Sequence, residues 1–313
     1  MKTITSFFKL IRVQNLLIMA ILMYFIRYFI LIPVYALDQI ELQMDGVSFF
    51  LFVIGYLLLA AGGYAINDYY DIGIDEINRP EKTILRKSIP LSRGRHIYYI
   101  LTGAGVLISL WAILLINAPK LIFVLAIVTL LYWFYTTKYK REFLSGNIAV
   151  SFLAALCVGI VWLYEFFAGV YNAVLPINQL RILTYIILAY SGFAFITTFL
   201  REIIKDIADI EGDKEFGCKS IPIVLGMKKT HLILVLLQVV LFIGILMSAI
   251  YFFRLNYMYM LSFTAVLIIL LIVFSFRLMK ANDRKDYLFI SDFVKIIFLA
   301  GIVSIQIFSL ELQ

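Results

Sequence analysis

Long apolar stretches recur along the whole 313-residue chain, and short polar stretches separate them. Each apolar stretch holds roughly 20 residues, the length that a helix needs to cross the ~30 Å hydrocarbon core of a bilayer. The pattern predicts nine membrane-spanning helices, at residues 13–36, 47–66, 96–116, 119–137, 147–170, 181–200, 230–253, 256–276 and 289–310. We therefore expect an all-α membrane protein built as a bundle of about nine transmembrane helices.

The composition supports this interpretation. The chain is 63% hydrophobic and only 15% charged, which is too little polar surface for a soluble α/β protein. It has no Pro-rich or Ser-rich linker, so we expect a single membrane domain over residues 1–313. The two cysteines, Cys157 and Cys218, are too few for a disulfide framework or a zinc site.

The positive charges predict how the bundle is oriented. Of the 27 Lys and Arg, 22 fall in five segments, which lie on one side if nine spans alternate. Loops that are rich in Lys and Arg stay in the cytoplasm, so we expect a cytoplasmic N-terminus, an external C-terminus and a bacterial inner membrane as the location. The net charge of +7 then reflects topology and contact with anionic membrane lipids, and no nucleic-acid partner is expected.

Two long loops on the predicted cytoplasmic side, 67–95 and 201–229, hold 11 of the 20 acidic residues. Three aspartates in each follow the same spacing of +3 and then +4. They are Asp68, Asp71 and Asp75 in the first loop, and Asp206, Asp209 and Asp213 in the second. On a helix this spacing places three carboxylates on one face, and each set continues the end of an apolar span.

Three carboxylates on one helical face repel one another unless a cation binds there. Dense oxygen ligands suit Mg²⁺, which prefers one or two carboxylates together with phosphate oxygens. Cations that can bind the remaining phosphate oxygens stand beside both sets. They are Arg79, Lys82, Arg86 and Lys87 in the first loop, and Arg201 and Lys205 in the second. The alternative, a solvated loop whose acids pair with nearby Lys and Arg, does not account for two matched clusters.

The sequence around the aspartates resembles a known family. "NDYYDIGID" (67–75) matches the NDxxDxxxD motif of the UbiA superfamily of intramembrane prenyltransferases, and "KDIADIEGD" (205–213) matches its second motif. "INRP" (77–80), "YTTKYKREFLSGN" (135–147) and "CKSIPIVLG" (218–226) resemble further family blocks in the same order. The resemblance covers about residues 10–226, although "LIRVQN" (10–15) has Val13 where the family often has proline.

The resemblance implies a donor with a diphosphate head and a polyisoprenyl tail, and two Mg²⁺ ions as cofactors. Asn67, Asp71 and Asp75, assisted by Asp68, would hold one ion, and Asp209 and Asp213, assisted by Asp206, the other. The leaving diphosphate would be bound by Arg79, Lys140, Arg201 and Lys205. Tyr135 would stabilise the allylic cation through its ring. Lys82, Arg86 and Lys87 lie in the least family-like part of the site, and we expect them to bind a phosphate on the acceptor as well as the donor diphosphate.

The acceptor is open at this stage. The form of "KDIADIEGD" is most like the geranylgeranylglyceryl-phosphate and chlorophyll synthase branches, which favours a geranylgeranylglyceryl phosphate-like lipid. The runner-up is an aromatic acceptor of quinone biosynthesis, of the 4-hydroxybenzoate, dihydroxynaphthoate or homogentisate type. A membrane transporter and an assembly protein are alternatives of other classes. Transporters usually place ionisable groups near mid-membrane, and here the mid-span candidate is Arg27, which we expect to be buried and paired or to snorkel.

Overall fold

The computed structural model describes residues 2–37, 39–171 and 177–312, and within these ranges the protein is helical and contains no strand. The elements in chain order are α1 (Lys2–Leu10), α2 (Val13–Phe25), the π-helix η1 (Ile26–Leu31), α3 (Ile32–Ala36), α4 (Gly46–Tyr70), α5 (Ile72–Asn78), the 3₁₀ turn η2 (Pro80–Lys82), α6 (Leu91–Leu115), α7 (Leu121–Thr137), the 3₁₀ turn η3 (Tyr139–Arg141), α8 (Ser145–Tyr171), α9 (Ile177–Ala208), α10 (Ile210–Glu215), α11 (Ile221–Arg254), α12 (Met258–Lys280) and α13 (Arg284–Leu310).

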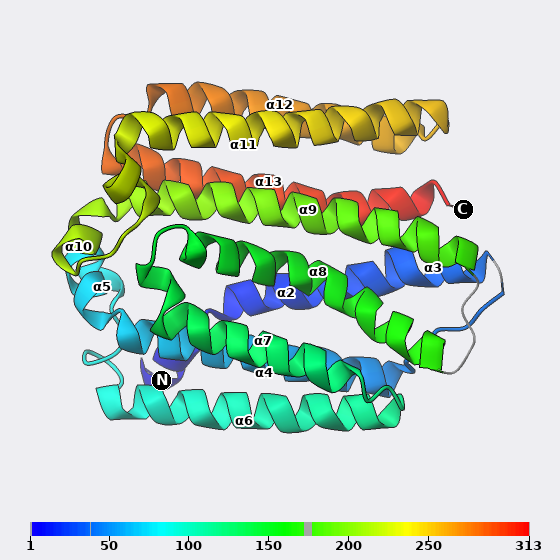
Figure 1. Ribbon diagram of the computed structural model, residues 1–313, viewed down its shortest axis with the longest axis horizontal. Coiled ribbons are helices and arrows are strands. Elements are labelled where there is room, and N and C mark those ends of the chain that lie inside the picture. Colours follow the sequence, from blue (N-terminus) through cyan, green and yellow to red (C-terminus); the bar gives the residue numbers. More distant parts are fainter. Residues whose placement is uncertain (1, 38, 172–176, 313) are drawn as a thin grey trace.

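The helices confirm the predicted membrane bundle. Eight helical segments in the described residues are long and apolar enough to cross a membrane, and α7 is a shorter apolar helix at the position of the predicted fourth span. The long helices lie side by side along one direction, and the two ends of the chain lie at opposite ends of the bundle (Figure 1). An odd number of crossings requires this placement of the termini.

Several helices extend beyond the predicted spans. The predicted spans 181–200 and 230–253 lie within α9, which continues to Ala208, and α11, which begins at Ile221 and kinks at Gly226 (φ 75°). The predicted first span, 13–36, is confirmed as one helical span, Val13–Ala36, in which the π-helix η1 continues α2 into α3. Hydropathy underestimated the lengths of α9 and α11 because polar residues continue a helix into the interfacial layer, where water and headgroups solvate them.

Local signals set several helix ends. The side chain of Asp45 accepts a hydrogen bond from Ser48 N (2.7 Å) at the start of α4. Asp283 and Asp286 form a capping box at the start of α13, and Pro222 lies in the first turn of α11. A carboxylate just before the first turn accepts hydrogen bonds from backbone N–H groups that have no partner within the helix. Proline in the first turn has no N–H that needs a partner.

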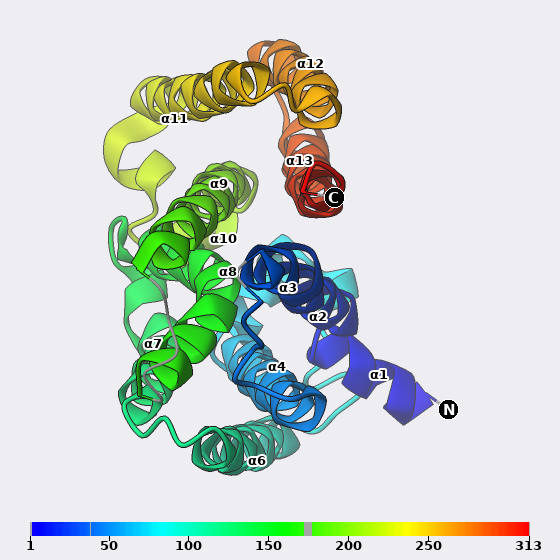
Figure 2. The ribbon, with the colours of Figure 1, turned by 90° about the vertical axis from the view of Figure 1, so that its right-hand side faces the viewer.

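The central helices of the bundle surround the region where the site lies. Figure 2 shows α2, α4, α8, α9 and α13 around the middle, with α6, α11 and α12 at the edges. Helices α4 and α6 pack closely because small residues face each other: a Cβ at Gly55 would lie 2.3 Å from Ser109 Oγ. Small residues allow membrane helices to approach and gain dispersion contacts where no hydrophobic effect drives them together.

A buried ion pair joins η1 to α8, and its carboxylate also binds the segment before α4. Arg27 Nη1 lies 3.4 Å from Glu165 Oε1, and the two carboxylate oxygens of Glu165 accept hydrogen bonds from Gln43 N (2.8 Å) and Met44 N (3.1 Å). The guanidinium also stacks over the ring of Phe49. The prediction that Arg27 is buried and paired is therefore confirmed. The pair does not line the cavity described below.

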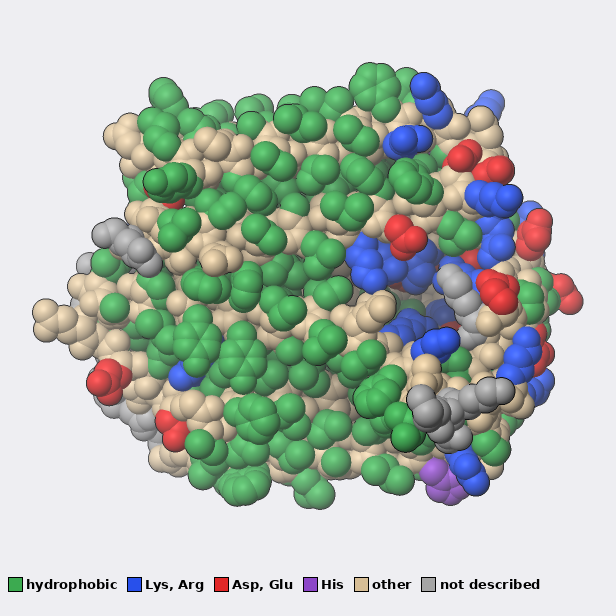
Figure 3. Space-filling view, turned by 180° about the vertical axis from the view of Figure 1, so that it is seen from behind, with side chains coloured by type: hydrophobic (Ala, Val, Ile, Leu, Met, Phe, Trp, Pro, Cys, Tyr) green, Lys and Arg blue, Asp and Glu red, His purple; other side chains and the backbone are tan. Residues whose placement is uncertain are grey.

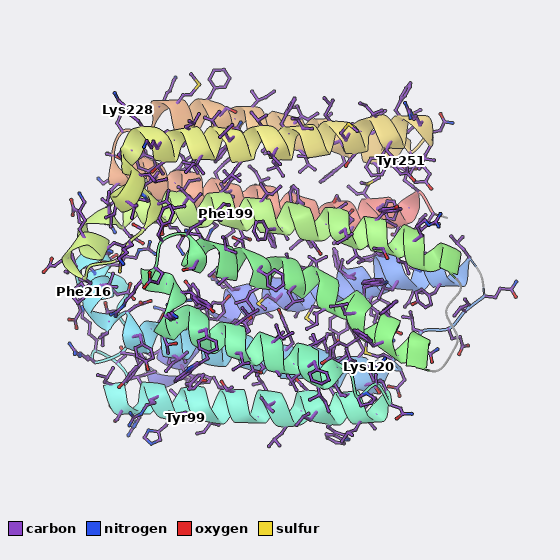
Figure 4. All side chains as sticks on the ribbon, viewed as in Figure 1. Tyr99, Lys120, Phe199, Phe216, Lys228 and Tyr251 are labelled. Carbon is purple, nitrogen blue, oxygen red and sulfur yellow. The ribbon has the colours of Figure 1, made fainter. Side chains whose placement is uncertain are left out.

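The two ends of the bundle differ in polarity. Helices α5 and α10 lie at one end, together with Phe216 and Lys228, while Lys120 and Tyr251 lie at the other end (Figure 4). The predicted Asp-rich loops are therefore at the same end of the bundle. We call it the acidic end, after the aspartates of α5 and α10.

Candidate active site

Both acidic segments form at a break between a long helix and a short one. Helix α4 ends at Tyr70 and α9 ends at Ala208, and one residue, Asp71 (φ -91°, ψ -1°) or Asp209 (φ -103°, ψ 9°), separates each from the short helix α5 or α10. The backbone bonds still continue, because Asp75 N donates to Asp71 O (2.8 Å) and Asp213 N to Asp209 O (3.1 Å). The predicted shared face thus survives, although the predicted continuous helix is interrupted. Aspartate is a weak helix former because its side chain competes for backbone groups.

The two acidic segments contact each other directly. Asn78, which is buried, donates from Nδ2 to Asp209 O (3.1 Å) and accepts at Oδ1 from Gly212 N (3.0 Å). Phe216 packs against Gly73, where a Cβ would lie 2.6 Å from its ring. Residues 131 to 143 positions apart are therefore held together, and the two aspartate sets belong to one site.

Cations neutralise the aspartates in pairs that cross between elements. Lys140 Nζ donates to Asp71 Oδ2, Arg79 Nη2 lies 2.5 Å from Asp209 Oδ2, and Arg12 Nη2 lies 2.8 Å from Asp68 Oδ1. Burial alone would lower the pKa of Lys140, but the neighbouring Asp71 carboxylate raises it above its ordinary value, so this lysine is charged.

A third arginine joins the last helix to this cluster. Arg284, the first residue of α13, donates from Nε to Ala208 O (2.9 Å) and from Nη2 to Asn78 O. Its Nη2 also lies 3.8 Å from Asp209 Oδ1. The guanidinium thus contacts both acidic segments at once.

A cavity of about 870 Å³ opens between these groups. Its deeper lining is apolar and includes Ile18, Met19, Leu22, Leu153 and Ala154. Figure 3 shows Lys and Arg side chains gathered around a hollow in an otherwise hydrophobic face of the molecule. The cavity therefore joins a charged end, suited to phosphate groups, to an apolar interior suited to hydrocarbon.

Most residues predicted for the site line this cavity. They are Asn67, Asp68, Asp71, Asp75, Arg79, Tyr135, Lys140, Arg201, Lys205, Asp206, Asp209 and Asp213. Arg86 and Lys87 do not: both are exposed, Arg86 pairs with Glu76 (3.3 Å), and Lys87 donates to Pro80 O (2.7 Å). The side chain of Lys82 lies outside the described residues.

Sequence reasoning missed other residues of the site. Arg12, Asn78, Asn147, Glu202, Arg284 and Lys295 line the cavity or bond to the aspartates. Asn147 donates to Asp206 Oδ2 (2.8 Å), and its block "YTTKYKREFLSGN" carried a signal for it. Arg12 and Asn78 also stand in recognisable blocks, "LIRVQN" and "INRP". Arg284 and Lys295 lie outside residues 10–226, the region that resembles the family, so no family block indicated them.

The oxygen-rich end of the cavity suits a hard divalent cation. Its side-chain donors are carboxylate and amide oxygens, and Asn67 Oδ1 and Asp209 Oδ1 are buried with no hydrogen-bond partner in the described structure. Burial raises the pKa of Asp75 and of Asp213 to about 6, which a nearby cation would reverse. In the described ranges no three Asp, Glu, His or Cys side chains form a ready metal cage. Mg²⁺ with phosphate oxygens needs only one or two carboxylates, so the residues fit.

A model of the UbiA prenyltransferase family matches residues 28–300. The chain belongs to this family. Digeranylgeranylglyceryl phosphate synthase of Sulfurisphaera tokodaii is 28% identical over 290 residues, which cover 91% of this chain and 93% of that protein. A solved structure described as giving insight into digeranylgeranylglyceryl phosphate synthase in membranes is 27% identical, with a TM-score of 0.60, and covers 98% of this chain and 99% of its own. A UbiA homologue from Archaeoglobus fulgidus bound to DMAPP and Mg²⁺ has the same fold (TM-score 0.56, 15% identity, 96% of this chain and 99% of that one).

As a member of the UbiA family, the protein is an integral membrane enzyme and a prenyltransferase. This finding decides against the transporter and the assembly protein. It also explains the shape of the cavity, because a prenyl donor has a charged diphosphate head, which needs a polar compartment, and a hydrocarbon tail, which needs an apolar one.

Proposed function

We propose that this protein transfers an isoprenyl chain from a polyprenyl diphosphate to a geranylgeranylglyceryl phosphate-like lipid. The observation that carries the proposal is the single cavity in which both aspartate sets face an apolar interior. In the reaction the donor C1–O bond breaks and its electron pair leaves with diphosphate. The acceptor hydroxyl oxygen bonds to C1 and releases its proton toward the polar end of the cavity. The relatives named digeranylgeranylglyceryl phosphate synthase support this acceptor class.

Two Mg²⁺ ions are part of the proposal. Asn67, Asp71 and Asp75, with Asp68 beside them, would hold one ion. Asp209 and Asp213, with Asp206 beside them, would hold the other. Bound Mg²⁺ supplies Lewis acidity that favours loss of diphosphate. The A. fulgidus homologue is described with Mg²⁺ and a prenyl diphosphate, which supports the use of this metal.

The cations at the aspartates would bind the diphosphate oxygens that the metals leave free. Lys140 contacts Asp71, Arg79 contacts Asp209, and Lys205 lies one helical turn before Asp209. Arg201, which the resemblance also assigns to the diphosphate, lies two turns before Asp209, and we place it at the acceptor phosphate instead. When donor and metals bind, Lys140 and Arg79 exchange a carboxylate for a phosphate oxygen, so their charge is already in place for the leaving group.

The remaining predicted residues differ in whether they line the cavity. Tyr135 lines the cavity near Lys140, where its ring can stabilise positive charge at C1 by about 0.5–2 kcal/mol. Arg86 and Lys87 lie outside the cavity, so the geometry does not support direct contact between them and an acceptor phosphate. The predicted contact of Lys82 stays a prediction.

We further propose that residues 1–313 act as one domain, with the acidic end and the N-terminus in the cytoplasm and the C-terminus outside. The excess of Lys and Arg at the acidic end supports this orientation. The bacterial inner membrane stays a prediction, and the named relatives come from archaea.

The test is a transfer assay with purified protein, geranylgeranyl diphosphate and a panel of acceptors. We expect Mg²⁺-dependent diphosphate release and alkylation of geranylgeranylglyceryl phosphate, with loss of both in EDTA. Transfer to 4-hydroxybenzoate, dihydroxynaphthoate or homogentisate alone would replace the acceptor class. Asp75→Asn should reduce turnover at least a hundredfold, since it removes a charged oxygen ligand. Glu76→Gln is the matched control, because Glu76 lies next to Asp75 but outside the cavity.

A further inference from the structure

A second group of charged residues lines the cavity farther from the acidic end. Arg201, Glu202 and Lys205 come from α9, and Lys295 comes from α13. The two helices pack against each other and run in opposite directions, since Arg284 at the start of α13 bonds to Ala208 at the end of α9. Ionisable residues within membrane helices are costly and commonly mark a binding site.

This group carries more positive than negative charge. At the aspartates the cations are paired with carboxylates: Arg12 with Asp68, Lys140 with Asp71, and Arg79 with Asp209. In the second group, by contrast, one carboxylate serves two cations.

The carboxylate of Glu202 is shared by Arg201 (3.2 Å) and Lys205 (2.9 Å). In the described part of the chain Lys295 has no ion pair within 4.0 Å, although Asp292 attracts it and Arg201 repels it. Arg201 Nε is buried without a hydrogen-bond partner in the described structure. Arg201, Lys205 and Lys295 with Glu202 carry a net charge of two, and the next carboxylate of the cavity lining, Asp206, accepts a hydrogen bond from Asn147. The excess of positive charge suits a phosphate monoester, which carries about −1.5 to −2 at pH 7.

The group also lies apart from the aspartates. Arg201 precedes Asp209 by eight residues, and Lys295 follows Arg284 by eleven, so each is about 12–16 Å farther along its helix. Long side chains lean toward the N-terminus of their own helix, so Arg201 leans away from Asp209 and Lys295 leans back toward the acidic end. Because α9 and α13 run in opposite directions, the two cations converge.

This depth suits the head of a lipid. Helix α9 has 32 residues, about 48 Å, so a ~30 Å hydrocarbon core centred on it leaves roughly 9 Å of helix at each end. Arg201 lies seven residues, about 10 Å, before the end of α9 and therefore near the boundary where lipid phosphates lie. Figure 3 shows Lys and Arg side chains around a hollow in the hydrophobic face, and Arg201 and Lys295 line the cavity.

We propose that Lys295 and Arg201 form a second anion site, which binds the phosphate of the acceptor lipid while the aspartates and metals hold the donor diphosphate. This inference rests on the proposed function and specifies which cations select the acceptor. It places the acceptor phosphate between α9 and α13 and not at the loop 79–95.

The test combines a variant with a change in the acceptor. For wild type and for Lys295→Gln, we measure the KM of three substrates. These are the phosphorylated acceptor geranylgeranylglyceryl phosphate, its dephosphorylated form geranylgeranylglycerol, and the donor. We expect Lys295→Gln to raise the KM of the phosphorylated acceptor about tenfold or more, and to leave the KM values of the alcohol and of the donor unchanged. Lys295→Arg should retain the preference for the phosphorylated acceptor.

Lys285→Gln is the control, because Lys285 lies exposed on the same helix and outside the cavity. Unchanged thermal unfolding of Lys295→Gln in detergent shows that it folds. An equal rise of KM for both acceptors, a rise in donor KM, or no change overturns the inference while wild-type transfer to the phospholipid still supports the proposed function. A wild type that alkylates only aromatic acceptors overturns the acceptor class itself.

Discussion

Asn78 joins the two acidic segments through one side-chain amide, and its replacement tests whether the site depends on their alignment. Asn78→Ala removes the donor to Asp209 O (3.1 Å) and the acceptor for Gly212 N (3.0 Å). Neither group gains a new partner from alanine, and Asn78 is buried, so water does not readily replace the amide.

The expected magnitude follows from these two bonds. Each contributes about 0.5–1.5 kcal/mol net, and a buried N–H left without a partner costs about 1–3 kcal/mol. If the transition state loses about 2 kcal/mol of the stabilisation from these two hydrogen bonds, kcat/KM falls about 30-fold. We also expect a higher Mg²⁺ concentration for half-maximal rate, since the two aspartate sets are no longer held at a fixed distance.

The assay is steady-state transfer at several Mg²⁺ concentrations, with thermal unfolding in detergent as a check on folding. Asn282→Ala is the matched control, because that asparagine is exposed at the same end, lies outside the cavity and donates to Lys280 O (3.1 Å). A well-folded Asn78→Ala protein with kcat/KM within twofold of wild type and the same Mg²⁺ dependence would refute the reasoning.

Two further predictions concern the bundle. Glu165→Ala should lower stability by about 3–5 kcal/mol, because it leaves a buried guanidinium and two backbone N–H groups without their acceptor. Unfolding in detergent measures this, and an unchanged melting temperature would contradict the assignment of the pair. Reporter fusions should place the N-terminus in the cytoplasm and the C-terminus outside, and both termini on one side would rule out an odd number of spans.

The part of the site that could be predicted is the part encoded by local spacing. Asp71 and Asp75 repeat at a helical interval, as do Asp209 and Asp213, so a single face was expected and the cavity contains all four. Their helical breaks were not expected, because the cost of placing aspartate in a helix depends on which hydrogen-bond partners the fold supplies.

The cross-chain contacts could not be derived in the same way. Arg284 and Asn78 are 206 residues apart, and nothing in either local sequence indicates that they meet. Arg86 and Lys87 are the reverse case, since they are close in sequence to the motif and do not line the cavity. They follow the acidic motif closely in sequence, but the loop turns them away from the cavity toward Glu76 and Pro80. Nearness along the chain predicted contact only where a helix fixes the geometry.

The contact of Arg284 with both acidic segments has a consequence for how the protein is made. Chains are synthesised from the N-terminus, so α13, with the cavity residues Val294, Lys295 and Phe298, is made after the other helices that the structure describes. Until then the acidic segments lack the arginine that bonds to both. The site is therefore complete only once α13 has been made, and a nascent chain stalled before residue 284 lacks the guanidinium that holds the two acidic segments together.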